Sequence, residues 1–377
     1  MFRNRTSRLR LSALIAVAFL TLSCDGVTGT VKSRPYYLGF TPWPYDITEA
    51  AVEETYRNIG VYADLICHHI DDGVPWPEAL NGEPYHPNVQ ADIESRLNHT
   101  PHGHKVYLSV GMLGPDRYGL AGYWAEESNG EMPPGWQGKT FDDPEVIAAY
   151  TNYCRYMIDA FDPDYFAYGI EVNANFTSSD TEFPGLMTLI SDVYTSLKGE
   201  YPSLPIFLSL IAINSGKDPT EFYATTKQML AYSDYVAVST YPFWEFILNV
   251  TGDSDPDKVV EADWLSAMAE LDPKKPFAVA ETGYIAEDLT LNDYGVNIEG
   301  TEEWQARYVE MLFDECERLD ARFIVWFCVR DYDQLWEYLE GEGFDEFFKT
   351  WRDTGLIDGD GNPRKALKVW DAGLAGN

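Results

Sequence analysis

The stretch "YFAYGIEVNAN", residues 165 to 175, is apolar and aromatic up to Ile170 and then presents Glu171. The stretch "PFAVAET", residues 276 to 282, has the same form and reaches Glu281. Short apolar runs of this kind, bounded by polar turn residues, predict buried β-strands. A carboxylate at the end of such a strand is costly to bury unless it is paired or used in chemistry. Both runs therefore predict a strand with a functional side chain at its end.

Strand-like runs and amphipathic helical patterns alternate along the chain. The helical patterns cover residues 47–60, 144–161, 220–233 and 301–319, and Thr301 begins the last one as a candidate N-cap. Alternating strands and helices are typical of βα units around a parallel sheet, and eight such units predict a single (β/α)8 barrel. The predicted strands are 36–40, 63–69, 105–112, 165–171, 206–211, 235–240, 277–282 and 323–328.

The first residues differ from the rest of the chain. Four arginines precede the apolar run "LSALIAVAFLTL", residues 11 to 22, which is too short to span a membrane as a helix and predicts an export signal over residues 1–23. Cys24 follows Ser23 as in bacterial lipoprotein signals, although Thr21 stands where leucine is usual. We expect lipidation of Cys24 at the cell envelope, periplasmic or at the surface, with plain secretion as the alternative. Residues 24–35 then form a tether, and residues 36–377 form one domain.

The chain is strongly acidic, with 27 lysines and arginines against 61 aspartates and glutamates and a formal charge of −34. Such a surface repels nucleic acid and anionic lipid, so we expect neither as a partner, and membrane contact only through the lipid anchor. The cysteines Cys67, Cys154, Cys316 and Cys328 show no CxxC spacing, which predicts buried thiols. We expect a monomer.

In a (β/α)8 barrel the carboxyl ends of the strands meet at one opening, where enzymes of this fold carry their sites. Glu171 on the fourth strand and Glu281 on the seventh are expected to face each other across it. Retaining glycosidases need this arrangement, because one carboxylic acid protonates the leaving oxygen while a carboxylate about 5 Å away attacks the anomeric carbon. The alternative is that each glutamate caps a helix or pairs with an arginine. The long connection 113–143 is predicted to be a loop on the same face.

Tryptophans follow several of the same strand ends. Trp43 and Trp76 each stand between two prolines, which stiffen the loop around a flat indole face. Trp244 follows the sixth strand in "YPFW", and Trp326 lies in the eighth, facing either into the barrel or out of it. Flat apolar faces beside carboxylates suit sugar rings, so these side chains are predicted to line the subsites.

The sequence "CHHIDDG", residues 67 to 73, ends the second strand. Adjacent histidines on a strand point to opposite faces, so only one of His68 and His69 can enter the opening. A sugar hydroxyl fits such a histidine better than a metal ion does, and Asp71 offers a further hydroxyl contact. The acidic segment 287–300 lacks EF-hand spacing, which favours a solvated loop over a calcium site. We expect no metal and no cofactor.

Several motifs resemble those of clan A glycoside hydrolases, and most of all the endo-β-1,4-galactanases of glycoside hydrolase family 53. The resemblance implies Glu171 as the acid/base, Glu281 as the nucleophile, and Tyr241 as the residue that hydrogen-bonds the nucleophile. The motifs are "YGIEVN" (168–173), "STYPFW" (239–244), "VAETGY" (279–284), "VWF" (325–327) and the closing "GLIDGDGNPRKALKVW" (355–370).

Two positions depart from the clan pattern. An asparagine usually precedes the acid/base residue and binds the sugar 2-hydroxyl, whereas this chain has Ile170. We expect Asn173, or else Asn175, to supply the missing amide. The arginine that is usual near the end of strand two is also missing, and His68 and His69 stand in its place.

The sequence thus predicts an exported, galactanase-like retaining endo-β-glycosidase that acts on a polysaccharide or oligosaccharide. In this prediction Glu171 holds a proton at the working pH and Glu281 stays ionised. A glycan-binding lipoprotein that kept the barrel and lost the chemistry is one alternative, consistent with Ile170 and the missing arginine. Another clan A hydrolase, such as a β-glucanase or β-mannanase, would share the mechanism and differ in its substrate.

Overall fold

The computed structural model describes residues 34–212, 218–243, 251–261 and 263–376. Two of the predicted residues, Cys24 and Trp244, lie outside this part of the chain, as does the predicted export signal. None of the helices in the described part combines the length and the apolar character needed to cross a membrane.

The central sheet has nine strands, each parallel to its neighbours, in the order β5-β4-β3-β2-β1-β12-β9-β7-β6. β5 and β6 stand at the two ends of this order, yet only Leu208 separates them in the chain. The order therefore closes on itself with β5 and β6 as one broken strand, and the predicted (β/α)8 barrel is confirmed. The strands are β1 Tyr37–Phe40, β2 Leu65–Ile70, β3 Lys105–Val110, β4 Tyr165–Ala167, β5 Ile206–Phe207, β6 Ser209–Ile211, β7 Val236–Thr240, β9 Phe277–Thr282 and β12 Phe323–Trp326.

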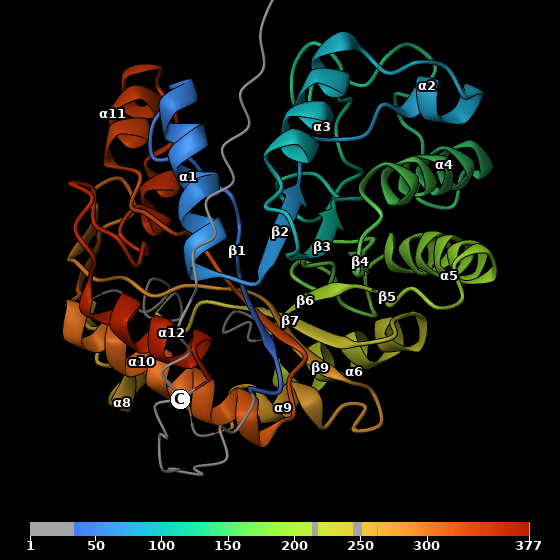
Figure 1. The fold of residues 1–377 in the computed structure, drawn as a ribbon. Helices are drawn as coiled ribbons and strands as arrows, with labels where there is room; N and C mark the ends of the chain where they lie inside the picture. The colour runs from blue at the N-terminus through green and yellow to red at the C-terminus, as the bar shows by residue number, and fades with distance from the viewer. Residues whose placement is uncertain (1–33, 213–217, 244–250, 262, 377) are drawn as a thin grey trace, which may run out of the picture. The chain divides into compact units, whose positions relative to one another are not determined.

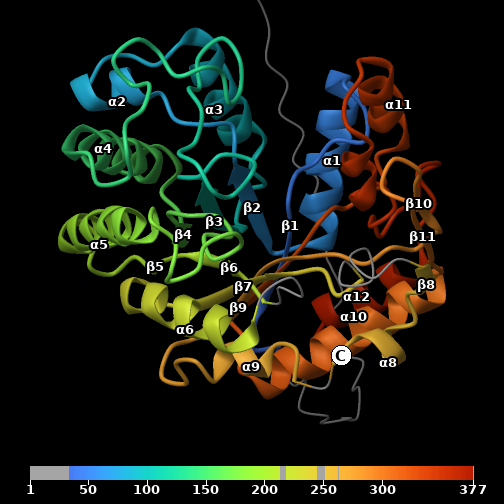
Figure 2. The ribbon, with the colours of Figure 1, turned by 180° about the vertical axis from the view of Figure 1, so that it is seen from behind.

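Helices surround these strands and connect them (Figure 1 and, from behind, Figure 2). Thr301 accepts a hydrogen bond from the backbone N of Trp304 at 3.1 Å, so its predicted role as an N-cap is confirmed. The helices are α1 Glu49–Tyr62, α2 Trp76–Asn81, α3 Pro87–His99, α4 Pro144–Phe161, α5 Phe183–Glu200, α6 Pro219–Met229, α8 Pro256–Val259, α9 Ser266–Ala269, α10 Glu302–Arg318, α11 Asp333–Gly341 and α12 Lys365–Leu374, with 3-10 helices η1 Leu230–Tyr232 and η2 Glu346–Trp351.

The acidic segment 287–300 is a β-hairpin, so its prediction as a solvated loop was wrong. Its strands β10 (Leu289–Leu291) and β11 (Val296–Glu299) pair antiparallel, and β11 also pairs with β8 (Thr251–Asp253). Leu289, Leu291 and Ile298 are buried, which stabilises the hairpin against the rest of the fold.

Side chains of the barrel strands alternate between two cores. Cys67, Ala237 and Phe323 belong to the cluster in the barrel interior, whereas Val238 and Ile324 pack in the layer between the sheet and the helices. All four predicted buried cysteines are buried. This alternation decides which residues at the strand ends enter the opening.

The long connection between β3 and α4 contains no helix or regular strand over residues 113–143. It folds back on itself through isolated bridges from Leu113 to Leu120 and from Tyr123 to Gly130. Because it leaves the carboxyl end of β3, it lies on the side of the barrel where the site was predicted.

Candidate active site

Glu281 reaches the barrel opening because β9 contains a bulge. Val279 pairs with Val238, but the next residue of β7, Ser239, pairs with Glu281, so Ala280 is the extra residue. Without the bulge, Glu281 would share the side of Val279, which packs in the outer layer. The bulge therefore turns this carboxylate into the opening.

Two side chains hold Glu281 in place. The Tyr241 hydroxyl donates to its Oε1 at 2.6 Å, and His69 Nδ1 lies 3.2 Å from its Oε2. Burial alone would raise the pKa of Glu281, but the charge and hydrogen bond of His69 and the hydrogen bond of Tyr241 outweigh burial and lower that pKa. Burial alone would lower the pKa of His69, and Glu281 reverses this, so the pKa of His69 is raised. The two groups therefore form a carboxylate–imidazolium pair.

Glu171 lies beyond β4, which ends at Ala167 and not at residue 171 as predicted. Its backbone has a φ of 49°, in the left-handed region that side chains other than Asn and Asp rarely adopt. The chain still follows the neighbouring strand, because Val172 N donates to Ser209 O at 3.2 Å. This turn directs the Glu171 carboxylate toward β7, where its Oε1 accepts a hydrogen bond from Ser239 Oγ at 2.7 Å.

The end of β7 brings the two glutamates together. Ser239 lies two residues after Ala237 and shares its inward face, and Tyr241 is the first residue beyond β7. Ser239 binds Glu171, and Tyr241 binds Glu281. Both carboxylates are therefore bound by residues two positions apart at the carboxyl end of β7.

An arginine that the sequence did not single out also joins the site. Arg117, in the loop after β3, donates from Nε to Glu171 Oε2 at 3.1 Å and from Nη1 to Asp71 Oδ2 at 2.7 Å. Asp71, which was predicted to contact a sugar hydroxyl, thus shares the Arg117 guanidinium with Glu171. The missing arginine of strand two was the available signal. No periodicity marks Arg117, because it lies in a long irregular loop whose course depends on tertiary contacts.

The adjacent histidines lie on opposite sides of β2. His69 enters the opening, whereas His68 is fully buried against Phe161 in the outer layer. His68 Nε2 donates to Thr100 Oγ1 at 2.8 Å, because that hydroxyl itself donates to the carbonyl of Arg96. Burial lowers the pKa of His68 to about 3, so its imidazole is neutral. His68 is therefore removed from the predicted hydroxyl-binding residues, and His69 stays among them.

The described tryptophans among the predicted subsite residues differ in exposure. Trp43 is partly exposed, and its ring centroid lies 5.6 Å from that of Phe327. Trp76 is fully buried, stacks on Trp136 and donates its indole N–H to a core carbonyl at 2.9 Å. Trp326 is also fully buried and donates to a carbonyl at 2.8 Å. Neither Trp76 nor Trp326 can offer a ring face to a sugar, so both predictions are corrected.

The alternation along β12 explains the position of Trp326. Phe323 and Val325 fill the barrel interior, so Trp326 points outward, where its ring lies 5.9 Å from that of Tyr308. Trp43, Phe327 and Trp351 are partly exposed rings near the site, and the ring of Trp351 lies 6.1 Å from that of Tyr241. Phe327 and Trp351 were not predicted.

Asn173 is fully buried and serves the fold. Its Nδ2 donates to Ile211 O at 3.1 Å and to Thr226 Oγ1 at 3.0 Å, while its Oδ1 accepts from Ile211 N at 2.8 Å. Both amide protons are used within the protein, so Asn173 does not replace the missing hydroxyl-binding amide. The side chain of Asn175 donates to Asp116 O at 2.7 Å and thereby ties the loop of Arg117 to the loop of Glu171.

One group of acidic side chains has the spacing of metal ligands. Oxygens of Asp331, Asp333 and Asp353 lie within 4.8 Å of one another. Arg352 pairs with Asp333 and Asp353, and Arg364 pairs with Asp331. Each aspartate of the group therefore has an arginine partner within the chain itself.

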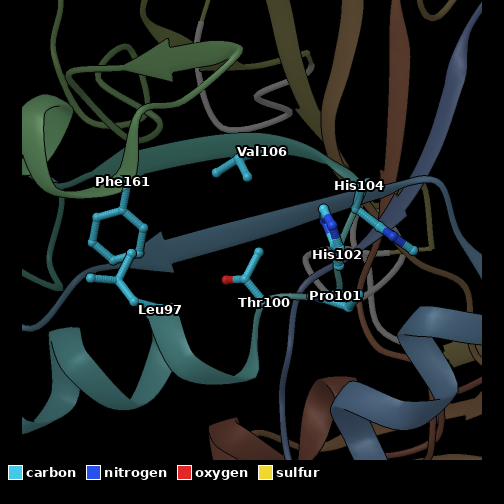
Figure 3. Close-up of a pocket in the computed structure, with 8 residues that line it drawn as sticks. Leu97, Thr100, Pro101, His102, His104, Val106 and Phe161 are labelled. Atoms are coloured by element: carbon cyan, nitrogen blue, oxygen red, sulfur yellow. The ribbon is translucent and has the colours of Figure 1, made fainter.

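A cavity of about 370 Å³ has neither glutamate among its lining residues, and Figure 3 shows side chains that line it. Its walls include residues 100–104, in the loop before β3, together with Val106 near the start of that strand and Phe161 at the end of α4. The amino ends of barrel strands are opposite the opening, so this cavity does not belong to the candidate active site.

A comparison with protein families found no matching family, and a search of curated proteins found no significant match. Solved structures do match. An exo-β-1,4-mannosidase from Opitutaceae bacterium strain TAV5 aligns with a TM-score of 0.60 and 14% identity over 91% of this chain and 60% of its own. A subfamily 18 enzyme of glycoside hydrolase family 5 from Streptomyces cattleya, in complex with GlcNAc, aligns with a TM-score of 0.61 and 14% identity over 91% and 80% of the two chains. A family 53 glycoside hydrolase catalytic domain from Ignisphaera aggregans aligns with a TM-score of 0.56 and 17% identity over 92% and 98%.

These neighbours support the (β/α)8 barrel fold that the sequence resemblance implied. The galactanase family is one of several among them, because a β-glucuronidase from Dictyoglomus thermophilum also aligns, with a TM-score of 0.53 and 14% identity over 90% of this chain and 50% of its own. At such low identity the likeness shows the shared fold alone.

Proposed function

We propose that the protein is a retaining β-glycosidase with Glu281 as the nucleophile and Glu171 as the acid/base. The observation that carries the proposal is that Ser239, in β7, binds Glu171, while Tyr241, the first residue after β7, binds Glu281. Retaining glycosidases use two carboxylates in different environments, one kept ionised and one that exchanges a proton. Here Glu281 is paired with His69, and Glu171 is bound by a different set of donors.

In the first step, Glu281 attacks the anomeric carbon as the bond from that carbon to the leaving oxygen breaks. The lowered pKa keeps Glu281 ionised, and the Tyr241 hydroxyl orients it. Glu171 gives its proton to the leaving oxygen. In the second step, Glu171 takes a proton from water, whose oxygen attacks the same carbon and releases Glu281. Two displacements leave the sugar with its original configuration.

As the substrate we propose an uncharged β-linked polysaccharide that is cleaved internally. A formal charge of −34 disfavours the approach of an anionic polymer. The partly exposed rings of Trp43, Phe327 and Trp351 suit the C–H faces of sugars. Solved neighbours include an exo-β-1,4-mannosidase and an enzyme in complex with Manβ1-4GlcNAc, so β-mannans stand beside β-galactans as substrates to test.

One observation favours a second candidate function, a glycan-binding protein without catalysis. Arg117 contacts Glu171 Oε2, an oxygen that an acid catalyst would need for its proton. A protein of this kind would bind glycan equally well after Glu281→Gln and would release no reducing ends from any polymer.

The proposal is tested by replacing the nucleophile. Glu281→Ala should lower turnover of an aryl β-glycoside by several orders of magnitude, and azide should restore part of it and form the α-glycosyl azide. Glu94→Ala, at an exposed glutamate on α3, is the matched control and should keep full activity. An active Glu281→Ala variant would exclude the nucleophile assignment.

We further propose that the protein is exported as a monomer and lipidated at Cys24. The support is the arginine-rich, apolar segment before that cysteine. Expression with a labelled fatty acid should label the protein and leave the Cys24→Ser variant unlabelled. Equal labelling of both would exclude Cys24 as the attachment site.

A further inference from the structure

We propose that Arg117 is a positioning residue that holds Glu171 as a carboxylate in the free protein. In this proposal it releases Glu171 by transferring its contacts to Asp71 when a substrate occupies the opening. The inference deepens the proposed function, because it rests on Glu171 being the acid/base.

The contacts of Glu171 define its state in the free protein. Oε1 accepts from Ser239 Oγ at 2.7 Å, and Oε2 accepts from Arg117 Nε at 3.1 Å. A guanidinium only donates hydrogen bonds, so a proton on Oε2 would compete with it. The arrangement suits the base form of Glu171. The acid form requires the Arg117 contact to loosen.

Asp71 provides the place to which Arg117 can shift. Arg117 Nη1 already donates to Asp71 Oδ2 at 2.7 Å, a shorter contact than the one to Glu171. Arg117 has only 16% of its side chain exposed, so losing every carboxylate partner would leave a buried charge unpaired at high cost. With Asp71 in place, the guanidinium can leave Glu171 and remain paired.

The backbone conformation provides independent evidence that Arg117 and Glu171 are functional. Across the part of the chain that the structure describes, five residues other than glycine have a positive φ, and three of them are Asn129, Asp162 and Asp320. Asparagine and aspartate adopt this conformation readily, whereas other side chains do so at a cost. The remaining two are Arg117 at 54° and Glu171 at 49°, which contact each other. Backbone strain of this kind gathers at functional sites.

The loop of Arg117 is fastened to the segment that carries Glu171. Asn175 Nδ2 donates to Asp116 O at 2.7 Å, and the rings of Tyr118 and Phe176 stack at 4.9 Å with an interplanar angle of 15°. The Asp116 carboxylate also accepts from the backbone N of Tyr118 at 3.0 Å, which stabilises the turn around Arg117. The contact between Arg117 and Glu171 is therefore maintained by both loops.

The charged groups around Glu171 predict opposite effects for two substitutions. Glu171 contacts Arg117, which also contacts Asp71, and it interacts electrostatically with Tyr241, whose hydroxyl binds Glu281 of the Glu281–His69 pair. Removing Arg117 leaves Glu171 among carboxylates and favours its protonated form. Removing the charge of Asp71 leaves Glu171 as the only one of these two carboxylates that is paired with Arg117. This favours the ionised form of Glu171. A merely structural role would not move the pH dependence in opposite directions.

The experiment compares pH profiles of kcat/KM for the protein and its variants on an unactivated β-glycoside. Arg117→Met should move the alkaline limb to higher pH by about one unit or more, and Asp71→Asn should move it to lower pH. The alkaline limb of Arg117→Lys should lie between those of the unaltered protein and Arg117→Met, because an ammonium cannot span both carboxylates. Arg155→Met, at an arginine paired with Glu200 on the outer helices, is the control and should leave the limb in place. Limbs that do not move, or that move in the same direction, would overturn the proposal.

A second readout separates this proposal from the proposed function. The carboxyl carbon of Glu171, labelled with ¹³C and assigned through Glu171→Gln, should titrate at a higher pH in Arg117→Met than in the unaltered protein. If that shift is seen but the unaltered protein hydrolyses no substrate, the role of Arg117 is supported and the glycosidase proposal is rejected. Turnover without that shift would reject the role of Arg117 and leave the glycosidase standing.

Discussion

The pair of His69 and Glu281 gives the sharpest prediction. His69→Gln removes the cation beside Glu281 and keeps a hydrogen-bond donor of similar size. At the 3.2 Å separation and an effective dielectric constant of about 20, the attraction is about 5 kcal/mol. Desolvation of both groups offsets part of it, so we expect the free energy of unfolding to fall by about 3–5 kcal/mol where both groups are charged.

The loss should depend on pH in a defined direction. The pKa of His69 is raised, so its stabilising contribution is complete below about pH 6.5 and disappears as pH rises through the folded value. The pKa of Glu281 is lowered, so its contribution is complete above about pH 4.5 and disappears as pH falls through the folded value. The deficit of His69→Gln should therefore be largest between about pH 4.5 and 6.5 and shrink on the alkaline side.

The neighbouring histidine, His68, is a control for which the stability loss should change with pH in the opposite direction. The pKa of His68 is lowered to about 3, so the neutral buried imidazole destabilises the fold increasingly as pH falls below about 6.5. His68→Gln removes this penalty. The difference in free energy of unfolding between the protein and this variant should therefore shrink by about 2 kcal/mol between about pH 6.5 and 5, since each pH unit corresponds to about 1.4 kcal/mol. Urea unfolding of the protein and both variants between about pH 4.5 and 9 measures the two curves. Parallel curves for the two variants would refute the assignment of one histidine to the opening and the other to the outer layer.

Three further predictions concern the site and its supports. Glu171→Ala should lower kcat/KM about 10²–10⁴-fold on a substrate with a poor leaving group and far less on a dinitrophenyl glycoside; equal losses would exclude the acid role. Asn173→Ala should lower the free energy of unfolding by about 2–4 kcal/mol with KM unchanged, and a raised KM without loss of stability would show that Asn173 binds substrate after all. Trp43→Ala should raise KM for a polymer about tenfold at nearly constant stability, whereas Trp326→Ala should cost about 3–5 kcal/mol of stability. Kinetics and denaturation of both variants measure these effects, and a stability loss in Trp43→Ala with a raised KM in Trp326→Ala would contradict the assignment.

The barrel could be predicted because each of its strands is a short apolar run between polar segments, a pattern that survives without knowledge of tertiary structure. The same alternation separates His68 from His69, and the sequence alone showed that only one could enter the opening. Which one it is depends on whether Cys67 faces the barrel interior. That choice is made by the closed barrel and not by the strand itself.

The remaining errors have similar causes. Both Trp76 and Trp326 looked like sugar platforms, yet burial depends on neighbours that are distant in sequence, such as Trp136 and Tyr308. The bulge that turns Glu281 into the opening has no signature in "PFAVAET", since it is defined by the pairing of β9 with β7. The hairpin in 287–300 could have been found, because its leucines, valine and isoleucine alternate with polar residues around an Asn-Asp-Tyr-Gly turn.

The stereochemistry of hydrolysis tests the central claim most directly. An aryl β-glycoside that the protein cleaves can be followed by ¹H NMR in D₂O, where the first anomer to form is seen before mutarotation. Two displacements through Glu281 and Glu171 predict that the β-anomer forms first. First appearance of the α-anomer would show a single displacement by water and would contradict the role of Glu281 as nucleophile.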